Sequence, residues 1–109
     1  MAQKKIYSRR SEEDRYVLVP SNLFLDQIES LSSKARSILD NKLSLALRNP
    51  FRNKSLKGYR FLFRIRFQDN DKEKRLIYPV ENHQIRVLCI LDRSRGYKDL
   101  KAYLRRLGY

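Results

Sequence analysis

The residues best suited to chemistry in this 109-residue chain are arginines that recur at short intervals in its second half. Arg64 and Arg66 are two residues apart in a segment of alternating apolar and basic side chains, which is the pattern of a β-strand with one basic face. Arg75 follows a polar turn and opens the predicted partner strand. Opposite residues of an antiparallel hairpin lie about 5 Å apart. We therefore expect these arginines to gather on the sheet face that is not covered by helices.

A cluster of arginines is suited to binding phosphate. The guanidinium group stays protonated and offers five donors in a planar fork, so it can hold a phosphate through two hydrogen bonds and stabilise charge that builds up on it. Arg93 and Arg95 follow the last predicted strand and are candidates for the same cluster, and Tyr97 could stack on an exposed base. The alternative is a half-exposed sheet whose polar face is simply rich in arginine.

The charge of the chain favours a polyanionic ligand. It has 25 Lys and Arg against 12 Asp and Glu, for a net charge of +13. Residues 51–109 alone hold 16 basic and 6 acidic residues, for a net charge of +10. Clustered excess charge of this size is typical of nucleic-acid-binding proteins, although an anionic membrane or an acidic protein would also fit.

Other common kinds of active site have little support. The single cysteine, Cys89, lies in an apolar run and is predicted to be a buried, inert thiol, and His83 lies in a polar turn typical of a solvated residue. The chain has no Cys/His cluster for a metal and no phosphate-binding glycine loop. No apolar run approaches the ~18 to 20 residues that cross a bilayer, and no signal peptide is evident. We therefore expect a cytoplasmic protein that uses no metal or cofactor.

The length of the chain allows one small domain and excludes an enzyme with separate cofactor and substrate domains. Residues 1–15 are polar and charged, with few apolar side chains to bury, so they are predicted to be a flexible basic arm. Residues 16–109 are predicted to form the domain.

The first half of the domain is predicted to be a strand followed by two helices. Residues 16–19 are β-prone and are expected to form an edge strand. Ser21 or Asn22 can cap a first helix, and a second helix is predicted to begin near Ser32 and to end before Pro50. Apolar residues recur at helical spacing in both, so the simplest arrangement is an antiparallel helical hairpin.

The second half is predicted to contain three strands and a short helix. The strands are expected over residues 61–67, 75–80 and 85–91, and an amphipathic helix over 97–107. The resulting order, β-α-α-β-β-β-α, predicts a small α+β domain with an antiparallel-rich sheet and helices packed on one face.

The order of these motifs resembles the RelE/ParE superfamily of type II toxin–antitoxin toxins. The segments that carry the resemblance are Ser55–Tyr59, Phe63–Phe67, Arg75–Val80, Ile85–Leu88 and Arg93–Lys98. The first is similar to the family's Leu-Lys-Gly turn, and the next two to its Tyr-Arg-Ile-Arg and Tyr-Arg-Leu-Ile-Tyr strands. The last two are similar to its final strand and its basic, tyrosine-ended tail. The resemblance covers roughly residues 16–98.

For the RelE branch, the resemblance implies a ribosome-dependent mRNA endonuclease, in which a ribose 2′-OH attacks its own 3′ phosphate without a metal ion. Arg64 and Arg66 fall where RelE has strand lysines, one of which acts as general base. The chain therefore departs from the family at this point, because a guanidinium is a poor base.

The resemblance also implies roles for residues further along the chain. Arg75 falls on the strand arginine that contacts the phosphate, Arg93 or Arg95 on the later basic residue, and Tyr97 on the C-terminal tyrosine. Further candidates for binding RNA or phosphate are Lys57, Arg60, Lys74 and Lys98.

Two alternatives remain open at this point. The ParE branch shares the scaffold and inhibits DNA gyrase without cleaving RNA, and a plain RNA-binding module would also be basic. As a RelE-like toxin the chain would have as partners a cognate antitoxin, the ribosome and mRNA. The antitoxin is expected to present an acidic, amphipathic segment to the basic half of the chain.

Overall fold

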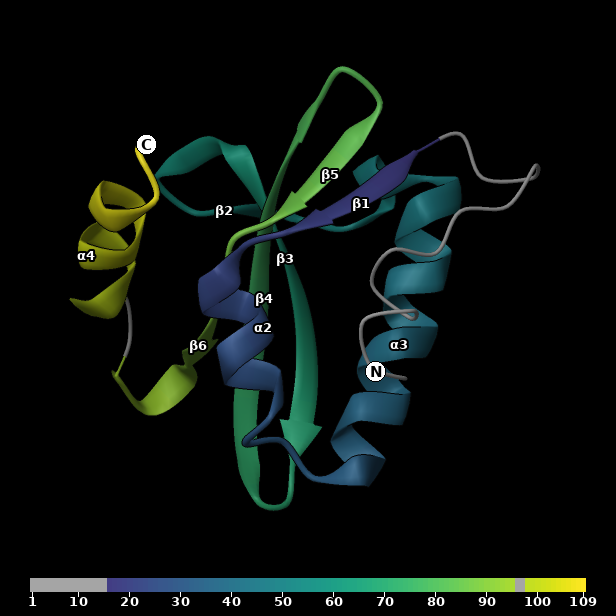
Figure 1. Cartoon of the computed structure of the whole chain (residues 1–109), viewed down its shortest axis with the longest axis vertical. Helices are drawn as coiled ribbons and strands as arrows, with labels where there is room; N and C mark the ends of the chain where they lie inside the picture. Colours follow the sequence, from purple (N-terminus) through teal and green to yellow (C-terminus); the bar gives the residue numbers. More distant parts are fainter. Residues whose placement is uncertain (1–15, 96–97) are drawn as a thin grey trace.

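The computed structural model describes residues 16–95 and 98–109 and has the mixed α+β architecture that the sequence predicts (Figure 1). The elements follow in the order β1 (Val17–Pro20), α2 (Asn22–Ile28), α3 (Ser33–Arg48), a 3-10 helix (Pro50–Arg52), β2 (Ser55–Leu56), β3 (Tyr59–Asp69), β4 (Lys72–Glu81), β5 (Gln84–Val87), β6 (Cys89–Asp92), a second 3-10 helix (Arg93–Arg95) and α4 (Lys98–Arg106). The expected basic arm, residues 1–15, lies outside the described residues. Within the described part, no helix has the length and apolar character needed to cross a membrane.

The strands form one six-stranded sheet in the order β1-β5-β4-β3-β2, with β6 paired to β4. The edge strand β1 runs parallel to β5, and the remaining pairs are antiparallel. The sequence predicts one strand over 85–91, whereas the structure divides it at Leu88, whose N–H donates to the carbonyl of Ile77 at 2.9 Å. Pro79 lies in β4 between the residues paired to β6 and those paired to β5, where its missing N–H leaves no gap in either ladder.

The β3–β4 hairpin is longer than the sequence predicts. Residues 68–72 are expected to be a polar turn, but strand pairing continues to Asp69 opposite Lys72. Only Asn70 and Asp71 remain for the turn, and Asn70 adopts a positive φ of 57°. Asparagine tolerates this left-handed conformation, which allows a two-residue connection. The structure also adds the short strand β2, which pairs with the first half of β3 and leaves the edge of the second half open.

Both helices begin where the sequence predicts; the second also ends there, while α2 ends at Ile28, before the predicted break at Ser32 and Ser33. The Ser21 hydroxyl accepts the N–H of Phe24 at 3.0 Å, and the Ser32 hydroxyl accepts the N–H of Ala35 at 3.1 Å, so each serine caps its helix. The second helix ends at Asn49, directly before Pro50.

The main core lies between these helices and one face of the sheet. Its largest members are buried side chains from the helices and from β3, β4 and β5, namely Phe24, Ile28, Leu39, Leu43, Leu47, Ile65, Phe67, Leu76, Tyr78 and Ile85. Each such side chain contributes about 1.5 to 3 kcal/mol when it is buried. The helical hairpin therefore packs on one face, as predicted.

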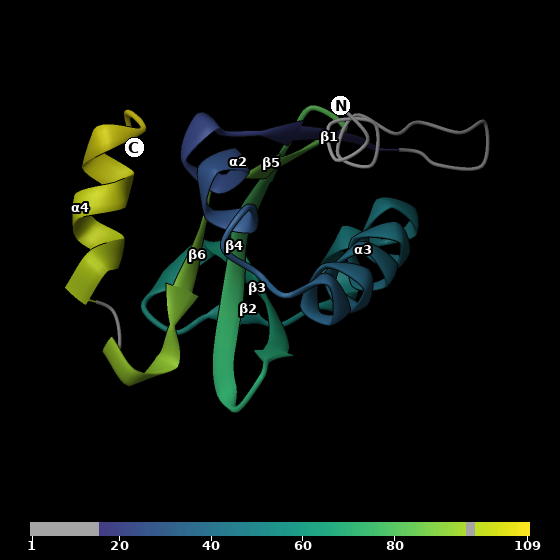
Figure 2. The same ribbon diagram turned by 60° about the horizontal axis from the view of Figure 1, so that its bottom comes forward.

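The expectation that all helices pack on one face is wrong for α4. Leu100 and Leu104 of this helix are buried with Leu62, Ile77 and Cys89 on the opposite face. Figure 2 shows α4 on one side of the sheet and α3 on the other. The reason is that Leu62 and Ile77 place an apolar patch on that face, which α4 covers. The rest of the face, toward the tip of the β3–β4 hairpin, carries the arginines.

Candidate nucleic-acid-binding site

The part of the sheet face that α4 leaves open carries arginines from neighbouring strands. Arg66 is directly opposite Arg75 in the β3–β4 pair, and Arg64 lies two residues along β3. The alternate residues Ile65 and Leu76 are buried in the core beneath the helical hairpin. Because side chains alternate between the faces of a strand, the arginines lie together on the face opposite that hairpin, as their spacing predicts.

One carboxylate lies among these arginines. The Oε2 atom of Glu73 is 3.7 Å from Nη2 of Arg75, and its Oε1 atom is 3.6 Å from Nη1 of Arg93. Both distances are longer than a direct hydrogen bond, and Glu73 Oε2 has no hydrogen-bond partner among the described residues. We call Arg64, Arg66, Arg75, Arg93 and Glu73 the arginine cluster.

The like charges of the arginine cluster lower the stability of the folded chain. Like charges directly opposite each other, as in Arg66 and Arg75, destabilise a strand pair by a few tenths of a kcal/mol to about 1 kcal/mol. Glu73 offsets only part of the repulsion, since its single carboxylate lies near Arg75 and Arg93 and the cluster holds four arginines. A surface that keeps such repulsion is typical of a site that binds an anion.

The structure separates Arg93 from Arg95, which the spacing alone does not distinguish. Arg95 binds Asp99 through two hydrogen bonds, Nε to Oδ2 at 2.7 Å and Nη2 to Oδ1 at 3.2 Å. This pair raises the pKa of Arg95 and lowers the pKa of Asp99. Arg95 therefore does not join the arginine cluster in this structure, whereas Arg93 does through Glu73.

Lys74 also lies apart from the cluster. It alternates with Glu73 and Arg75 along β4, so its side chain is on the other face, where its ammonium is 3.2 Å from Asp92. Lys74, Asp92 and Arg95 line one pocket between α2, β6 and α4. The structure thus places two of the predicted basic residues in ion pairs away from the arginine cluster.

A basic pocket adjoins the arginine cluster at the open edge of β3. It has a volume of about 390 Å³ and is lined by Lys42, Leu45, Arg52, Asn53, Lys54, Arg64, Ile65 and Arg66. We call it the β3-edge pocket. Arg64 and Arg66 belong to both this pocket and the arginine cluster, so the two form one continuous basic surface.

The solved structures that resemble this chain include two that contain RelE. The first is a variant of the E. coli toxin RelE in the free state, with two arginines changed to alanine. It is 22% identical, with a TM-score of 0.67, and the match covers 84% of this chain and 96% of that one. The chain has the RelE fold. The second is the intact E. coli RelBE toxin–antitoxin complex, 26% identical with a TM-score of 0.58, covering 69% of this chain and 93% of that one. No protein-family model and no curated protein sequence matches the chain.

The resemblance to RelE that the sequence motifs indicate is thus confirmed for the fold.

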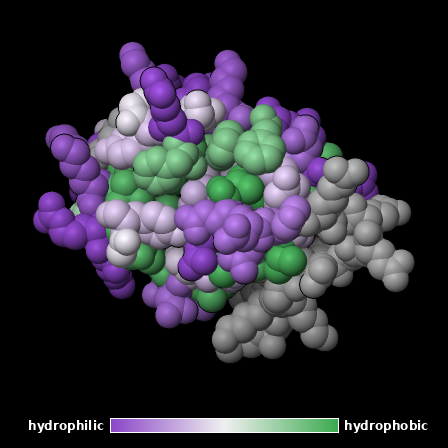
Figure 3. Space-filling model, turned by 90° about the horizontal axis from the view of Figure 1, so that it is seen from above, coloured by the Kyte–Doolittle hydropathy of each residue, from purple (hydrophilic) through white to green (hydrophobic). Residues whose placement is uncertain are grey.

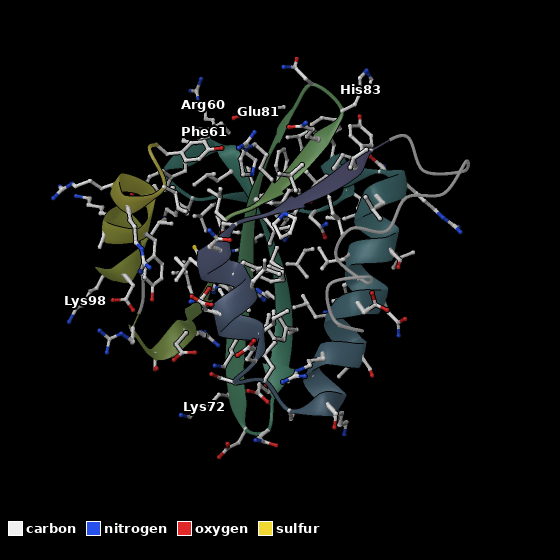
Figure 4. All side chains as sticks on the ribbon, viewed as in Figure 1. Arg60, Phe61, Lys72, Glu81, His83 and Lys98 are labelled. Atoms are coloured by element: carbon white, nitrogen blue, oxygen red, sulfur yellow. The ribbon has the colours of Figure 1, made fainter. Side chains whose placement is uncertain are left out.

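The remaining predicted basic residues lie away from the arginine cluster. The Leu-Lys-Gly turn lies between β2 and β3, where Gly58 has a φ of 87° that favours glycine, and it leaves Lys57 exposed. Arg60 lies at the opposite end of the molecule from Lys72 at the hairpin tip, and Lys98 begins α4 (Figure 4). These basic residues are exposed and do not join the arginine cluster. Tyr97 lies outside the described residues.

Three basic residues of the β3-edge pocket were not predicted from the sequence. Lys42 is an exposed residue of α3 and belongs to the polar side of that helix. Arg52 and Lys54 lie in the irregular segment after α3, where no periodicity assigns a direction to a side chain. Only the approach of this segment to β3 brings the three together. The one sequence signal is the density of basic residues between 52 and 66.

His83 and Cys89 occupy the positions expected for residues without a chemical role. His83 is exposed in the β4–β5 turn with a φ of 64°, and its ring packs against Tyr16 with centroids 5.8 Å apart. Cys89 is buried on β6. Burial raises the pKa of the Cys89 thiol to about 12.

The burial and raised pKa of the Cys89 thiol predict that it reacts slowly in the folded chain. The thiolate is the reactive form, and with a pKa of about 12 only about one thiol in ten thousand is ionised at about pH 8. We expect a chromogenic disulfide reagent to leave the folded chain unmodified and to titrate one thiol in denaturant. Rapid reaction of the folded chain would contradict this assignment.

Proposed function

We propose that the chain is the toxin of a type II toxin–antitoxin system and cleaves mRNA on the ribosome. The observation that carries the proposal is the arginine cluster, four arginines and one carboxylate on an open part of a sheet with the RelE fold. Both similar structures contain proteins described as toxins, which supports the same class of function here.

In this proposal the arginines bind the scissile phosphate. Arg75 is held by the strand pair and is only 13% exposed, so its guanidinium is positioned before RNA binds. Arg93 is 67% exposed and can close over the phosphate from the other side of Glu73. Fixed positive charges aimed at a phosphate stabilise the additional negative charge of its pentacoordinate transition state. These charges would take the place that a metal ion holds in other nucleases.

The cleavage step is a transesterification. The ribose 2′-oxygen forms a bond to the adjacent phosphorus while the bond from phosphorus to the 5′-oxygen breaks, which leaves a 2′,3′-cyclic phosphate and a free 5′-hydroxyl. Arg64 and Arg66 stand where the family has lysines, and a guanidinium does not give up its proton. Glu73 is the member of the arginine cluster that can accept the 2′-OH proton, and solvent supplies the proton to the 5′-oxygen.

An antitoxin is the partner that the surface favours. The basic half of the chain would attract an acidic segment, and exposed apolar side chains offer further contacts, among them Leu45, Phe51 and Phe61. At the upper end of the molecule, apolar side chains lie among strongly hydrophilic ones (Figure 3). The RelBE complex is an assembly of a toxin with its antitoxin, which supports this proposal.

Induction of the protein in cells tests the proposed function. We expect growth arrest together with new mRNA ends, and with purified components we expect cleavage of mRNA only when ribosomes are translating it. Growth arrest without new mRNA ends, accompanied by loss of DNA supercoiling, would replace the proposal with gyrase inhibition. Binding of RNA without growth arrest or cleavage would indicate an RNA-binding module.

A further inference from the structure

The β3-edge pocket has a charge that is not balanced by the protein. Its basic members are Lys42, Arg52, Lys54, Arg64 and Arg66, and no acidic side chain lines it. None of these five is in an ion pair with another described residue. Five cations around a space of about 390 Å³ repel one another, and an anion in that space would remove the repulsion.

One wall of the pocket is the segment that follows α3, and Tyr78 of β4 holds this segment in place. The buried hydroxyl of Tyr78 donates to the carbonyl of Pro50 at 2.6 Å and accepts the side-chain amide of Asn53 at 2.9 Å. The carbonyl of Lys54 accepts the N–H of Arg64 at 3.1 Å, which ties the same segment to β3. The pocket therefore exists before a ligand binds, and little ordering is needed on binding.

The opposite wall comes from α3. Lys42 reaches across the open edge of β3, where its ammonium donates to the carbonyl of Arg66. Leu45, one turn of the helix away, is 44% exposed and adds an apolar surface beside the charges. A site that combines fixed cations with a small apolar surface fits a phosphate attached to a sugar and a base.

We propose that the β3-edge pocket binds a backbone phosphate of single-stranded RNA next to the phosphate held by the arginine cluster. The inference rests on the proposed function for the identity of the polymer. Arg64 and Arg66 join the pocket to the cluster, so one strand can cross the edge of β3 and contact both sites. The continuity of the pocket with the arginine cluster, which is proposed to hold the scissile phosphate, favours RNA over an acidic peptide as the occupant.

Binding to an RNA that cannot be cleaved tests the proposal. We would measure by fluorescence anisotropy the affinity of the full chain for a short single strand with 2′-O-methyl riboses, over a range of salt concentrations. The pocket variant combines Lys42→Ala, Arg52→Ala and Lys54→Ala. A control variant combines Lys34→Ala, Lys101→Ala and Arg105→Ala, which removes the same charge from exposed positions elsewhere.

The pocket variant is expected to bind about tenfold or more weakly than the wild type, since each lost contact is a hydrogen bond to a charged group. The slope of log affinity against log salt concentration should fall by about 0.7, the value for one phosphate contact to a single strand. The control variant should keep most of the affinity. Thermal unfolding should show the pocket variant to be as stable as the wild type or more so, because it loses like-charge repulsion.

A scan with neutral methylphosphonates, one position at a time, locates the contact. We expect one position at which the substitution weakens binding by the wild type and the control variant and not by the pocket variant. Equal losses for the pocket and control variants, with no such position, would overturn the inference. So would a pocket-dependent affinity for polyglutamate alongside pocket-independent binding of RNA, since the occupant would then be an acidic protein segment.

The same experiment keeps this inference separate from the proposed function. The 2′-O-methyl strand has no nucleophile, so its binding does not depend on catalysis. If the wild type fails to cleave mRNA on the ribosome but the scan maps a phosphate to the pocket, the nuclease proposal is rejected and the inference of a phosphate site in the pocket is supported. Cleavage of mRNA with pocket-independent binding gives the reverse result.

Discussion

Replacing Arg75 by alanine is expected to abolish growth arrest on induction and to lower the rate of ribosome-dependent mRNA cleavage by 10²- to 10³-fold. In the proposed reaction Arg75 contacts the phosphate while its negative charge rises. Loss of one preorganised donor of this kind costs about 3 to 4 kcal/mol of transition-state stabilisation. Arg75→Lys should recover only part of the rate, because an ammonium keeps the charge but not the planar fork.

The measurement is single-turnover cleavage on programmed ribosomes, with growth curves and mRNA-end mapping in parallel. Arg86→Ala is the matched control, since Arg86 is also a half-buried strand arginine and lies on β5, outside the arginine cluster and the β3-edge pocket. Thermal unfolding should show that Arg75→Ala remains folded. If Arg75→Ala and Arg86→Ala arrest growth equally and neither variant nor the wild type produces new mRNA ends, the nuclease proposal fails and gyrase inhibition replaces it.

The arginine cluster could be predicted largely from the sequence because strand alternation is a local property. Arg64 and Arg66 share a face whatever the register, and the β3–β4 turn then brings Arg75 opposite Arg66. The position of Arg93 relative to Arg95 could not be predicted. It depends on the second 3-10 helix and on the bidentate pairing of Arg95 with Asp99.

The placement of α4 and the β3-edge pocket depended on contacts between distant segments. Leu62 and Ile77 make one half of the polar face apolar, which moves α4 to that side. Lys42, Arg52 and Lys54 come together because Tyr78 anchors the segment after α3 to the sheet. No periodic pattern in the sequence indicates either placement. The helix caps, by contrast, were predictable, because Ser21 and Ser32 act within their own helices.

Replacing Glu73 by glutamine separates two roles that its position allows. As a proton acceptor, Glu73 would activate the 2′-OH, and its loss would lower the rate of cleavage by about 10²- to 10⁴-fold. As a positioning residue only, it would hold Arg75 and Arg93, at 3.7 and 3.6 Å, and its loss would change the rate much less. Glutamine has the same shape and cannot take up the proton, so we expect the large effect.

RNA affinity gives the second readout for this variant. Removal of a negative charge beside the arginines should leave the affinity for 2′-O-methyl RNA unchanged or higher, even as cleavage is lost. Glu81→Gln, an exposed carboxylate of the same strand, is the control for net charge and should cleave at the wild-type rate. A Glu73→Gln variant that cleaves within tenfold of the wild type would remove Glu73 as the proton acceptor and leave it the role of positioning Arg75 and Arg93.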